Sequence, residues 1–330
     1  MVKVLIVDDS AFMRNALTSM LTSDSEIKIV GTAKDGIEAI EKIGSLKPDV
    51  VTMDVEMPRM DGLTALKQIM EKNPVPVIMV SSIATEGAKA TLDALDLGAV
   101  DFIPKNLSEI SVNILKIRDI LIEKVKQISK KGPIKRHLQR LREPRSVDTI
   151  RHIPVNMAGS RRVGIISIGT STGGPKALQE IIPRFPKELP VPVVIAQHMP
   201  PAFTKPFAER LDHLSEIKVK EAEQGEPLRP GIALIAPGRG NMRVVRKRGI
   251  ETVVSITEND EEFIYRPSVD ALMLSVAECF PGRALGVIMT GMGNDGLKGL
   301  IEIKKTGGRV FAQNEETCIV YGMPKAVVDA

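Results

Sequence analysis

The stretch from Gly164 to Pro175 constrains the fold most, because an apolar run passes directly into a turn of small residues and then into a helix start. The run Gly164-Ile-Ile-Ser-Ile168 is rich in β-branched residues and shows no polar face, which is typical of a strand buried in a parallel sheet. Pro175 suits the first turn of a helix. The stretch therefore predicts a strand–turn–helix unit of an α/β sheet, with the turn at the carboxyl end of the strand.

The turn Gly169-Thr-Ser171-Thr-Gly173 fits the G-x-S-x-G pattern, in which glycines permit a sharp bend that exposes one serine hydroxyl. In this interpretation Ser171 is a nucleophile. Two alternatives stay open at this point, because backbone amides at a helix start also bind phosphate groups and a glycine turn can be purely structural. A catalytic serine needs partners from elsewhere in the chain.

The length of 330 residues suggests two domains, and the charge distribution indicates where they join. Residues 124–162 contain twelve Lys or Arg residues and two acidic residues, whereas the whole chain has a net charge of +4, so the flanking regions are mildly acidic. The same segment contains three prolines and loses regular apolar periodicity. We therefore predict domains over residues 1–123 and 161–330, joined by a basic linker over residues 124–160.

The first region alternates five apolar runs with helical patterns. The predicted strands are Val2–Val7, Ile27–Ala33, Asp49–Val55, Val75–Ser81 and Ala99–Pro104. Five such units with right-handed crossovers make a doubly wound parallel sheet, and sheets of this kind bind ligands beyond the carboxyl ends of their strands.

Polar side chains stand at those carboxyl ends: Asp8 and Asp9, Asp54, Ser81 and Lys105. Three converging carboxylates repel one another unless a hard divalent cation lies between them, which predicts a Mg²⁺ site. The hydroxyl and the ammonium group are donors for an anion at the same place, so the set suits phosphoryl transfer to Asp54. The alternative is that the aspartates only form turns and the lysine is a solvated charge.

Four motifs resemble the receiver domain of two-component response regulators: Val7-Asp-Asp-Ser-Ala-Phe-Met-Arg14, Met53-Asp-Val-Glu-Met-Pro58 with Asp61-Gly62, Val80-Ser-Ser82 and Phe102-Ile-Pro-Lys105. The resemblance covers roughly residues 1–120. It implies that a histidine kinase phosphorylates Asp54. It also implies Mg²⁺ ligands (Asp8, Asp9, Asp54 and the backbone carbonyl of Glu56) and residues that respond to the phosphoryl group (Ser81, Phe102 and Lys105).

Two strand ends in the second region carry candidate partners for Ser171. The predicted strand Val191–Ala196 leads to His198, and the predicted strand Ala284–Met289 leads to a glycine turn that carries Asp295. Since carboxyl ends of parallel strands share one edge, we expect a Ser–His–Asp set with His198 as general base, Asp295 orienting the imidazole, and backbone N–H groups near Met292 binding the oxyanion. The alternatives are a hydrogen-bonded structural histidine and an N-cap aspartate.

Six motifs of this region resemble the catalytic domain of the chemotaxis protein-glutamate methylesterases: Ile168-Gly-Thr-Ser-Thr-Gly-Gly174, Gln197-His-Met-Pro200 with Phe203-Thr204, Ile235-Ala-Pro-Gly238, Arg266-Pro-Ser-Val-Asp270, Met289-Thr-Gly-Met-Gly-Asn-Asp-Gly296 and Tyr321-Gly-Met-Pro324. The resemblance implies hydrolysis of γ-glutamyl methyl esters on chemoreceptor cytoplasmic domains through a glutamyl-serine intermediate, and often deamidation of receptor glutamines. It implies no cofactor for ester hydrolysis. Many relatives have a histidine at the position of Asn241, so we assign that residue no catalytic role.

Together these observations predict an α/β protein of two doubly wound, mainly parallel-sheet domains: a flavodoxin-like receiver and a Rossmann-like esterase domain with a β-hairpin near Arg248-Gly249. We expect a cytoplasmic enzyme that is recruited to chemoreceptor arrays, with a chemotaxis histidine kinase as phosphodonor. Membrane insertion is not expected, because no apolar run approaches about 18 residues. Cys279 and Cys318 lack CxxC spacing and are expected to be reduced and buried.

Three further expectations concern regulation and rival functions. We expect the unphosphorylated receiver to cover the Ser171 edge and the phosphoryl group on Asp54 to weaken that contact. A non-enzymatic regulator whose linker binds nucleic acid is disfavoured, because no helix-turn-helix or aromatic platform accompanies the basic residues and aromatic residues are 3% of the chain. A hydrolase for another ester or amide remains the alternative enzyme.

Overall fold

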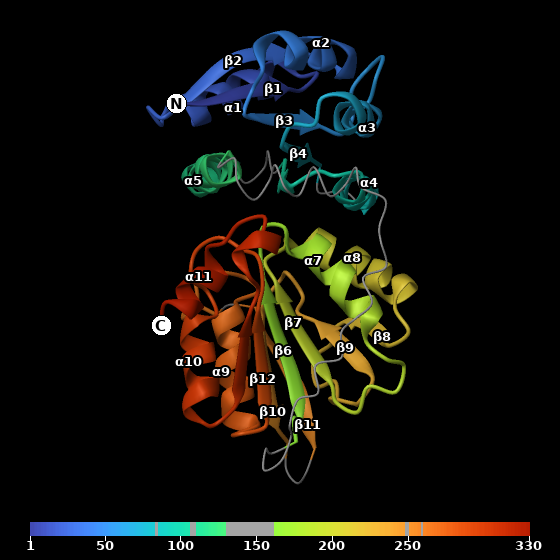
Figure 1. Cartoon of the computed structure of the whole chain (residues 1–330), viewed down its shortest axis with the longest axis vertical. Coiled ribbons are helices and arrows are strands. Elements are labelled where there is room, and N and C mark those ends of the chain that lie inside the picture. Colours follow the sequence, from blue (N-terminus) through green and yellow to red (C-terminus); the bar gives the residue numbers. More distant parts are fainter. Residues whose placement is uncertain (83–84, 106–109, 130–161, 248–250, 259) are drawn as a thin grey trace.

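Both halves of the chain are built on a parallel sheet, and the two sheets lie one above the other along the long axis in Figure 1. The computed structural model describes residues 1–82, 85–105, 110–129, 162–247, 251–258 and 260–330. The prediction of two doubly wound α/β units is confirmed by the strand orders given below.

The amino-terminal sheet has the order β2-β1-β3-β4-β5, with every neighbouring pair parallel. Its strands are β1 (Val2–Val7), β2 (Ile27–Ala33), β3 (Val50–Asp54), β4 (Val77–Ser81) and β5 (Asp101–Pro104). Its helices are α1 (Ala11–Thr22), α2 (Gly36–Leu46), α3 (Gly62–Lys72), α4 (Thr85–Asp96) and α5 (Ile110–Ile128). Successive strands are added to one side of β1 and then to its other side, so the strand order has its switch point between β1 and β3. In sheets of this kind the ligand crevice lies at the carboxyl ends of the two strands at the switch point.

The carboxy-terminal sheet has the order β13-β12-β6-β7-β9-β8 and is also entirely parallel. Its strands are β6 (Ile165–Thr170), β7 (Val193–Gln197), β8 (Lys218–Glu221), β9 (Ile232–Ile235), β12 (Ala284–Ile288) and β13 (Arg309–Ala312). The helices around it are α7 (Gly174–Ile181), α8 (Pro201–Leu214), α9 (Val269–Cys279), α10 (Leu297–Lys305) and α11 (Met323–Val328). In this sheet the switch point of the strand order lies between β6 and β12, the strands that precede Ser171 and Asp295.

The central strands form because their side chains are buried on both faces. All six residues of β6 and all five of β7 are buried, which explains why these runs show no polar alternation. The predicted β-hairpin is present as the antiparallel pair β10 (Asn241–Arg246) and β11 (Thr252–Thr257). Its predicted turn at residues 248–249 lies outside the described residues.

Strand bounds differ from the predictions where the backbone cannot join the ladder. The strand predicted from Val75 begins at Val77, because Pro76 lacks an amide hydrogen. The strand predicted from Ala99 begins at Asp101, because the amide of Ala99 still closes helix α4 on the carbonyl of Ala94. Strands β8, β9 and β13 were not predicted. Each has only four residues, and β8 and β13 are half-exposed edge strands whose side chains do not form an apolar run.

Helix α5 continues to Ile128 and buries Val125 and Ile128, so the predicted domain boundary at residue 123 falls inside a helix of the amino-terminal domain. Apolar residues at these two positions extend the helix into the segment that its charge marked as linker. The rest of the predicted linker, residues 130–160, lies outside the described residues.

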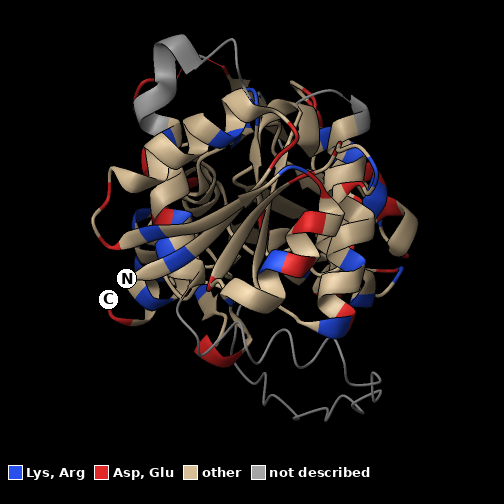
Figure 2. Cartoon of the chain, turned by 90° about the horizontal axis from the view of Figure 1, so that it is seen from above, with Lys and Arg blue, Asp and Glu red and all other residues tan. Residues whose placement is uncertain are grey.

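The cysteine prediction can be compared with the structure, whereas most of the predicted basic linker lies outside the described residues. Over the described helices in Figure 2, Lys and Arg are interspersed with Asp and Glu. Cys279 and Cys318 are free and buried, as predicted. In the part of the chain that the structure describes, no helix combines the length and the apolarity needed to cross a membrane.

The two domains pack through α4, β5 and α5 on one side and the upper end of the carboxy-terminal domain on the other (Figure 1). Phe102 of β5 stacks on Phe203 of α8, with ring centroids 4.5 Å apart, and both rings belong to one buried hydrophobic cluster that spans the two domains. At the rim, Arg210 of α8 pairs with Asp93 (Nη1 to Oδ1, 2.7 Å) and with Asp96 of α4. The contact therefore has an aromatic stack in its buried part and ion pairs at its edge.

Candidate active site

Ser171 follows β6 in a tight turn that is held by backbone and side-chain hydrogen bonds. Its amide donates to the carbonyl of Thr290 (3.0 Å), and its carbonyl accepts from the amide of Gly174 (2.8 Å) and from Nε2 of Gln197 (3.0 Å). Gly173 has a φ of +77°, a conformation that side-chain-bearing residues rarely adopt. Gly173 is thus required by the sharp bend that presents the Ser171 hydroxyl, whereas Gly169 leaves room for Val269, with which a Cβ there would clash.

His198 follows β7 and contacts both of its predicted partners. Its Nδ1 lies 3.1 Å from Oγ of Ser171, and its Nε2 lies 2.7 Å from Oδ2 of Asp295. Parallel pairing of β6 with β7 brings the two loops together, and the His198 amide continues this pairing by donating to the carbonyl of Thr170. A carboxylate beside Nε2 favours the tautomer with hydrogen on Nε2, which leaves Nδ1 free to accept the hydroxyl proton.

Asp295 is held at the amino terminus of α9 by three donors besides the histidine. The amide of Val269 donates to Oδ2 (2.7 Å), and the amide of Asp270 and the hydroxyl of Ser268 donate to Oδ1 (both 3.0 Å). Burial alone would raise the pKa of Asp295, but the hydrogen bonds from His198, Asp270 and Val269 outweigh it and lower the pKa. The carboxylate is therefore a stable anion.

A buried polar chain behind Asp295 was not found from the sequence. Asn241 accepts from the amide of Ser268 (2.7 Å) and donates to Oδ2 of Asp260 (3.1 Å), which also pairs with Arg243 (2.6 Å). Asn241 thus supports Ser268, which holds Asp295; among the described residues, its side-chain hydrogen bonds go to Ser268 and Asp260 and not to His198 or Ser171. Its role depends on the folding of the hairpin against α9, and sequence spacing carries no signal for that.

The predicted oxyanion donor Met292 lies in the loop after β12, next to the nucleophile. The loop is close to Ser171, since a Cβ added to the neighbouring Gly291 would lie 2.9 Å from Cβ of Ser171. This proximity agrees with the predicted position, and the role of the Met292 N–H stays a prediction. A second residue that the sequence did not reveal, Tyr265, stacks on the His198 ring.

The amino-terminal domain gathers its predicted acidic residues at the β1–β3 crevice. Carboxylate oxygens of Asp8, Asp9 and Asp54 lie within 4.8 Å of one another. Lys105 is inserted between two of them, with Nζ 2.6 Å from Oδ2 of Asp54 and 2.8 Å from Oδ2 of Asp8. These hard oxygen donors fit Mg²⁺, which binds through one or two carboxylates and retains several waters.

Burial dominates the electrostatics of Asp54. It raises the pKa of Asp54 to about 6; Lys105 acts in the opposite direction, and the neighbouring Asp8 adds to the increase. A divalent cation at this crevice would offset the repulsion between the carboxylates.

The other predicted residues of this domain lie at the same edge or point toward the neighbouring domain. Glu56 lies two residues beyond Asp54, and its amide donates to Oδ1 of Asp54 (3.4 Å). Ser81 ends β4, and its buried hydroxyl donates to the carbonyl of Gly87 in α4 (3.2 Å). Phe102 instead contacts Phe203 of the carboxy-terminal domain. The structure therefore separates Phe102 from the acidic cluster and places it in the interface.

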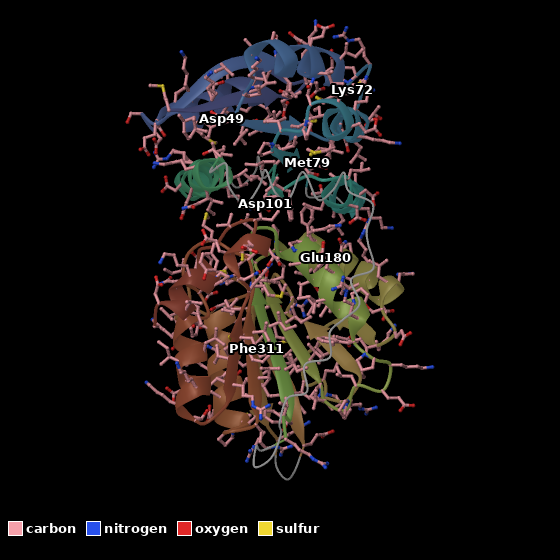
Figure 3. The ribbon with its side chains drawn as sticks, in the orientation of Figure 1. Asp49, Lys72, Met79, Asp101, Glu180 and Phe311 are labelled. Atoms are coloured by element: carbon pink, nitrogen blue, oxygen red, sulfur yellow. The ribbon has the colours of Figure 1, made fainter. Side chains whose placement is uncertain are left out.

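One hydrogen bond joins β5 directly to the serine turn. The hydroxyl of Thr172, the residue after Ser171, donates to Oδ2 of Asp101 (2.7 Å), and both side chains are buried. The same carboxylate accepts from Lys124 of α5 (2.5 Å). Figure 3 shows Asp101 in the band between the two sheets. The residue before Phe102 thus touches the residue after the candidate nucleophile.

Comparisons with known proteins agree with both halves of this arrangement. The family model for CheB methylesterase matches residues 166–330, and the model for the response regulator receiver domain matches residues 4–114. The chain is 50% identical to protein-glutamate methylesterase/protein-glutamine glutaminase 1 of Oleidesulfovibrio alaskensis, over 100% of this chain and 94% of that protein. It is 47% identical to the protein-glutamate methylesterase/protein-glutamine glutaminase of Pyrococcus abyssi, over 99% of this chain and 88% of that protein.

A third relative, the protein-glutamate methylesterase/protein-glutamine glutaminase of Lawsonia intracellularis, is 50% identical over 100% of this chain and 94% of its own length. One family model thus spans half of the chain, and these relatives align over nearly all of it. The chain belongs to the CheB methylesterase family, in the form that carries an amino-terminal response regulator receiver domain.

Proposed function

We propose that this protein hydrolyses glutamyl methyl esters of chemoreceptor cytoplasmic domains by a Ser–His–Asp mechanism, and that phosphorylation of the receiver activates it. The observation that carries the catalytic part is the pair of contacts made by His198, one nitrogen 3.1 Å from the Ser171 hydroxyl and the other 2.7 Å from the Asp295 carboxylate. The names of relatives aligned over the full length support the ester substrate.

The first half-reaction acylates the serine. Nδ1 of His198 accepts the Ser171 proton while Oγ attacks the ester carbonyl, and Asp295 stabilises the imidazolium that forms. A backbone N–H at Met292 donates to the oxyanion, and loss of one such donor costs about 3 kcal/mol. When the carbonyl re-forms, the C–O bond to the methoxy group breaks and His198 returns the proton to it, which releases methanol.

The second half-reaction frees the enzyme. His198 removes a proton from water, the resulting hydroxide equivalent attacks the glutamyl-serine ester, and Ser171 leaves with the proton from the imidazolium. The product is a receptor glutamate. A receptor glutamine gives the same acyl intermediate with ammonia as leaving group, so the same residues support deamidation, in agreement with the glutaminase names of the relatives.

In the receiver, we infer that Asp8, Asp9, Asp54 and the Glu56 carbonyl would hold Mg²⁺, and that the ion, when bound, would reduce the repulsion between the carboxylates and supply positive charge for a phosphoryl group. Asp54 accepts the phosphoryl group from a chemotaxis histidine kinase. Lys105 already lies 2.6 Å from Asp54 and is placed to pair with a phosphoryl oxygen. Ser81 is positioned at the adjacent strand end for the same purpose.

Activation then operates through the interface. The receiver contacts Thr172 through Asp101 and Phe203 through Phe102, beside the nucleophile turn. We propose that this docking restricts receptor access and that phosphorylation weakens it. A tenfold activation requires a bias of about 1.4 kcal/mol, and a change from 1:99 to 99:1 requires about 5.5 kcal/mol. The loss of a few interface contacts is sufficient for the smaller value.

We place the receiver in residues 1–129 and the catalytic domain in residues 161–330, with the basic segment between them as linker. The first boundary follows the end of α5 at Ile128. Recruitment to chemoreceptor arrays in the cytoplasm follows from the proposed substrate and kinase.

The deciding experiment measures methanol release from methylated receptor by the full chain and by Ser171→Ala. We expect loss of release in Ser171→Ala and no change in the matched control Ser167→Ala. Ser167 lies within β6, the strand that precedes Ser171, and its buried hydroxyl has no hydrogen-bond partner among the described residues. Equal release by Ser171→Ala and the unaltered chain would overturn the serine mechanism. Turnover of other esters with none of methylated receptor would reassign the substrate.

A further inference from the structure

The ring of Tyr265 lies flat on the imidazole of His198, with centroids 4.4 Å apart and planes 13° apart. Tyr265 belongs to the segment between β11 and α9 and is 40% exposed, whereas the His198 side chain is 13% exposed. The stack therefore covers one face of the imidazole at the entrance to the serine turn.

This contact restrains a motion that the hydrogen bonds of His198 resist only weakly. The bonds to Ser171 and Asp295 lie at the ring nitrogens and act mainly within the ring plane. Displacement perpendicular to that plane bends both bonds before it breaks them, and hydrogen bonds weaken as their angle departs from linearity. An aromatic ring in van der Waals contact with one face opposes such displacement directly.

The same contact also has an electronic consequence. His198 becomes a cation when it accepts the serine proton, and the face of a tyrosine ring attracts cations through its quadrupole. This attraction is greater in the transition state than in the resting enzyme, where the imidazole is neutral. An interaction of that kind raises kcat and leaves substrate binding unchanged.

The phenol end of Tyr265 points toward the loop that follows β12. A Cβ added to Gly293, the neighbour of Met292, would lie 3.4 Å from the phenol oxygen. Burial, with smaller contributions from Asp295 and Glu123, raises the pKa of Tyr265 above its usual value. The phenol therefore stays neutral at neutral pH and adds no negative charge beside Asp295.

Resting on the proposed Ser–His–Asp mechanism, we propose that Tyr265 is a positioning residue that holds the His198 ring between Ser171 and Asp295 and stabilises its protonated form. The stacked ring performs this role, and the hydroxyl does not. Phenylalanine at position 265 should therefore preserve the activity, whereas leucine should not.

The test compares kcat and KM for methanol release by the full chain carrying Tyr265→Leu or Tyr265→Phe. We expect Tyr265→Leu to lower kcat about tenfold with KM unchanged, and Tyr265→Phe to stay within twofold of the unaltered chain. The matched control is Ile264→Ala, which removes the neighbouring side chain, 84% exposed, and should leave kcat unchanged. Labelling of Ser171 by a small organophosphonate should slow in Tyr265→Leu alone, and thermal unfolding should show that all variants are folded.

Three outcomes would overturn the proposal. Unchanged kcat in Tyr265→Leu would show that the stack is dispensable, and a change confined to KM would show that Tyr265 contacts substrate instead. Equal losses in the Leu and Phe variants would assign the effect to the hydroxyl. The Ser171→Ala variant separates these failures from failure of the proposed function. Activity in Ser171→Ala would contradict the Ser–His–Asp mechanism itself. An inactive Ser171→Ala variant together with a fully active Tyr265→Leu variant would contradict only the role of Tyr265.

Discussion

Two buried aspartates, Asp54 in the receiver and Asp295 in the catalytic domain, stand at the same topological place and have opposite electrostatics. Each follows or ends a central strand where the sheet order reverses. Burial raises the pKa of Asp54 to about 6; Lys105 and the Glu56 amide act against this increase, and the neighbouring Asp8 adds to it. Burial acts on Asp295 as well, but donors from His198 and the start of α9 lower its pKa.

The difference indicates what each carboxylate is suited for. A carboxylate with few donors keeps its oxygens available, so Asp54 can bind a cation and attack a phosphoryl group. A carboxylate with every lone pair directed at a donor is a fixed anion, so Asp295 can orient and stabilise an imidazolium for the whole catalytic cycle. Fold position alone does not distinguish the two roles; the number of local donors does.

The largest effect should come from Asp295→Asn. The amide cannot stabilise the imidazolium and favours the wrong imidazole tautomer, so we expect kcat for methanol release to fall by roughly 10³- to 10⁴-fold. The control variant Asp212→Asn weakens the pair of Asp212 with Lys218 and the bond from the Val219 amide, far from the serine turn, and should retain full activity. A fall of less than tenfold in Asp295→Asn would remove the proposed contrast between the two aspartates.

Asp54→Asn should leave the basal rate intact and abolish its increase by a small acyl phosphate. We expect the loss of an activation of about tenfold, because the amide neither accepts a phosphoryl group nor supplies a full ligand charge for Mg²⁺. Removal of Mg²⁺ with a chelator should reproduce this result in the unaltered chain. The comparison fails if Asp54→Asn is still activated by the phosphodonor, or if it inactivates the basal reaction.

At pH 7 without Mg²⁺, Asp54→Asn and Asp295→Asn should change the free energy of unfolding in opposite directions. Because the pKa of Asp54 is raised, the stability associated with its protonated carboxyl is full below about pH 4 and is lost as pH rises through about 6. At pH 7 the buried carboxylate therefore destabilises the fold, and its replacement by the neutral amide in Asp54→Asn should raise the free energy of unfolding. The lowered pKa of Asp295 means that its carboxylate stabilises the fold above about pH 4 and less below it, so Asp295→Asn should lower that free energy. Denaturant titrations should show changes in the free energy of unfolding of opposite sign for the two variants, and equal signs would contradict the assignment.

The smallest effect concerns the interface between the two sites. Arg210→Ala removes the ion pairs to Asp93 and Asp96, and we expect the basal rate of the unphosphorylated chain to rise about twofold, since partly exposed pairs contribute roughly 0.2 to 1 kcal/mol. Lys218→Ala removes an exposed pair within the catalytic domain and should have no effect. A lower basal rate in Arg210→Ala would argue against restriction of access by the receiver.

The candidate site could be predicted because its three residues lie in loops that follow the carboxyl ends of predicted parallel strands. Ser171, His198 and Asp295 each follow an apolar run of parallel-sheet character, and such strands deliver their loops to one edge. The same logic located Asp8, Asp54 and Lys105. Residues contributed by loops and by the other domain escaped it: Tyr265 reaches His198 from a segment without periodicity, and Asp101 reaches Thr172 across a domain boundary.

The sequence by itself determined two parallel α/β sheets, the serine turn and the acids at the strand ends, because these depend on residue periodicity and glycine placement over short distances. Only the tertiary structure decided which histidine nitrogen faces the serine, why Asn241 and Ser268 matter to Asp295, and that α5 extends to Ile128. Those features depend on how distant segments pack, and the energy of each contact is set by burial and donor geometry that local sequence does not encode.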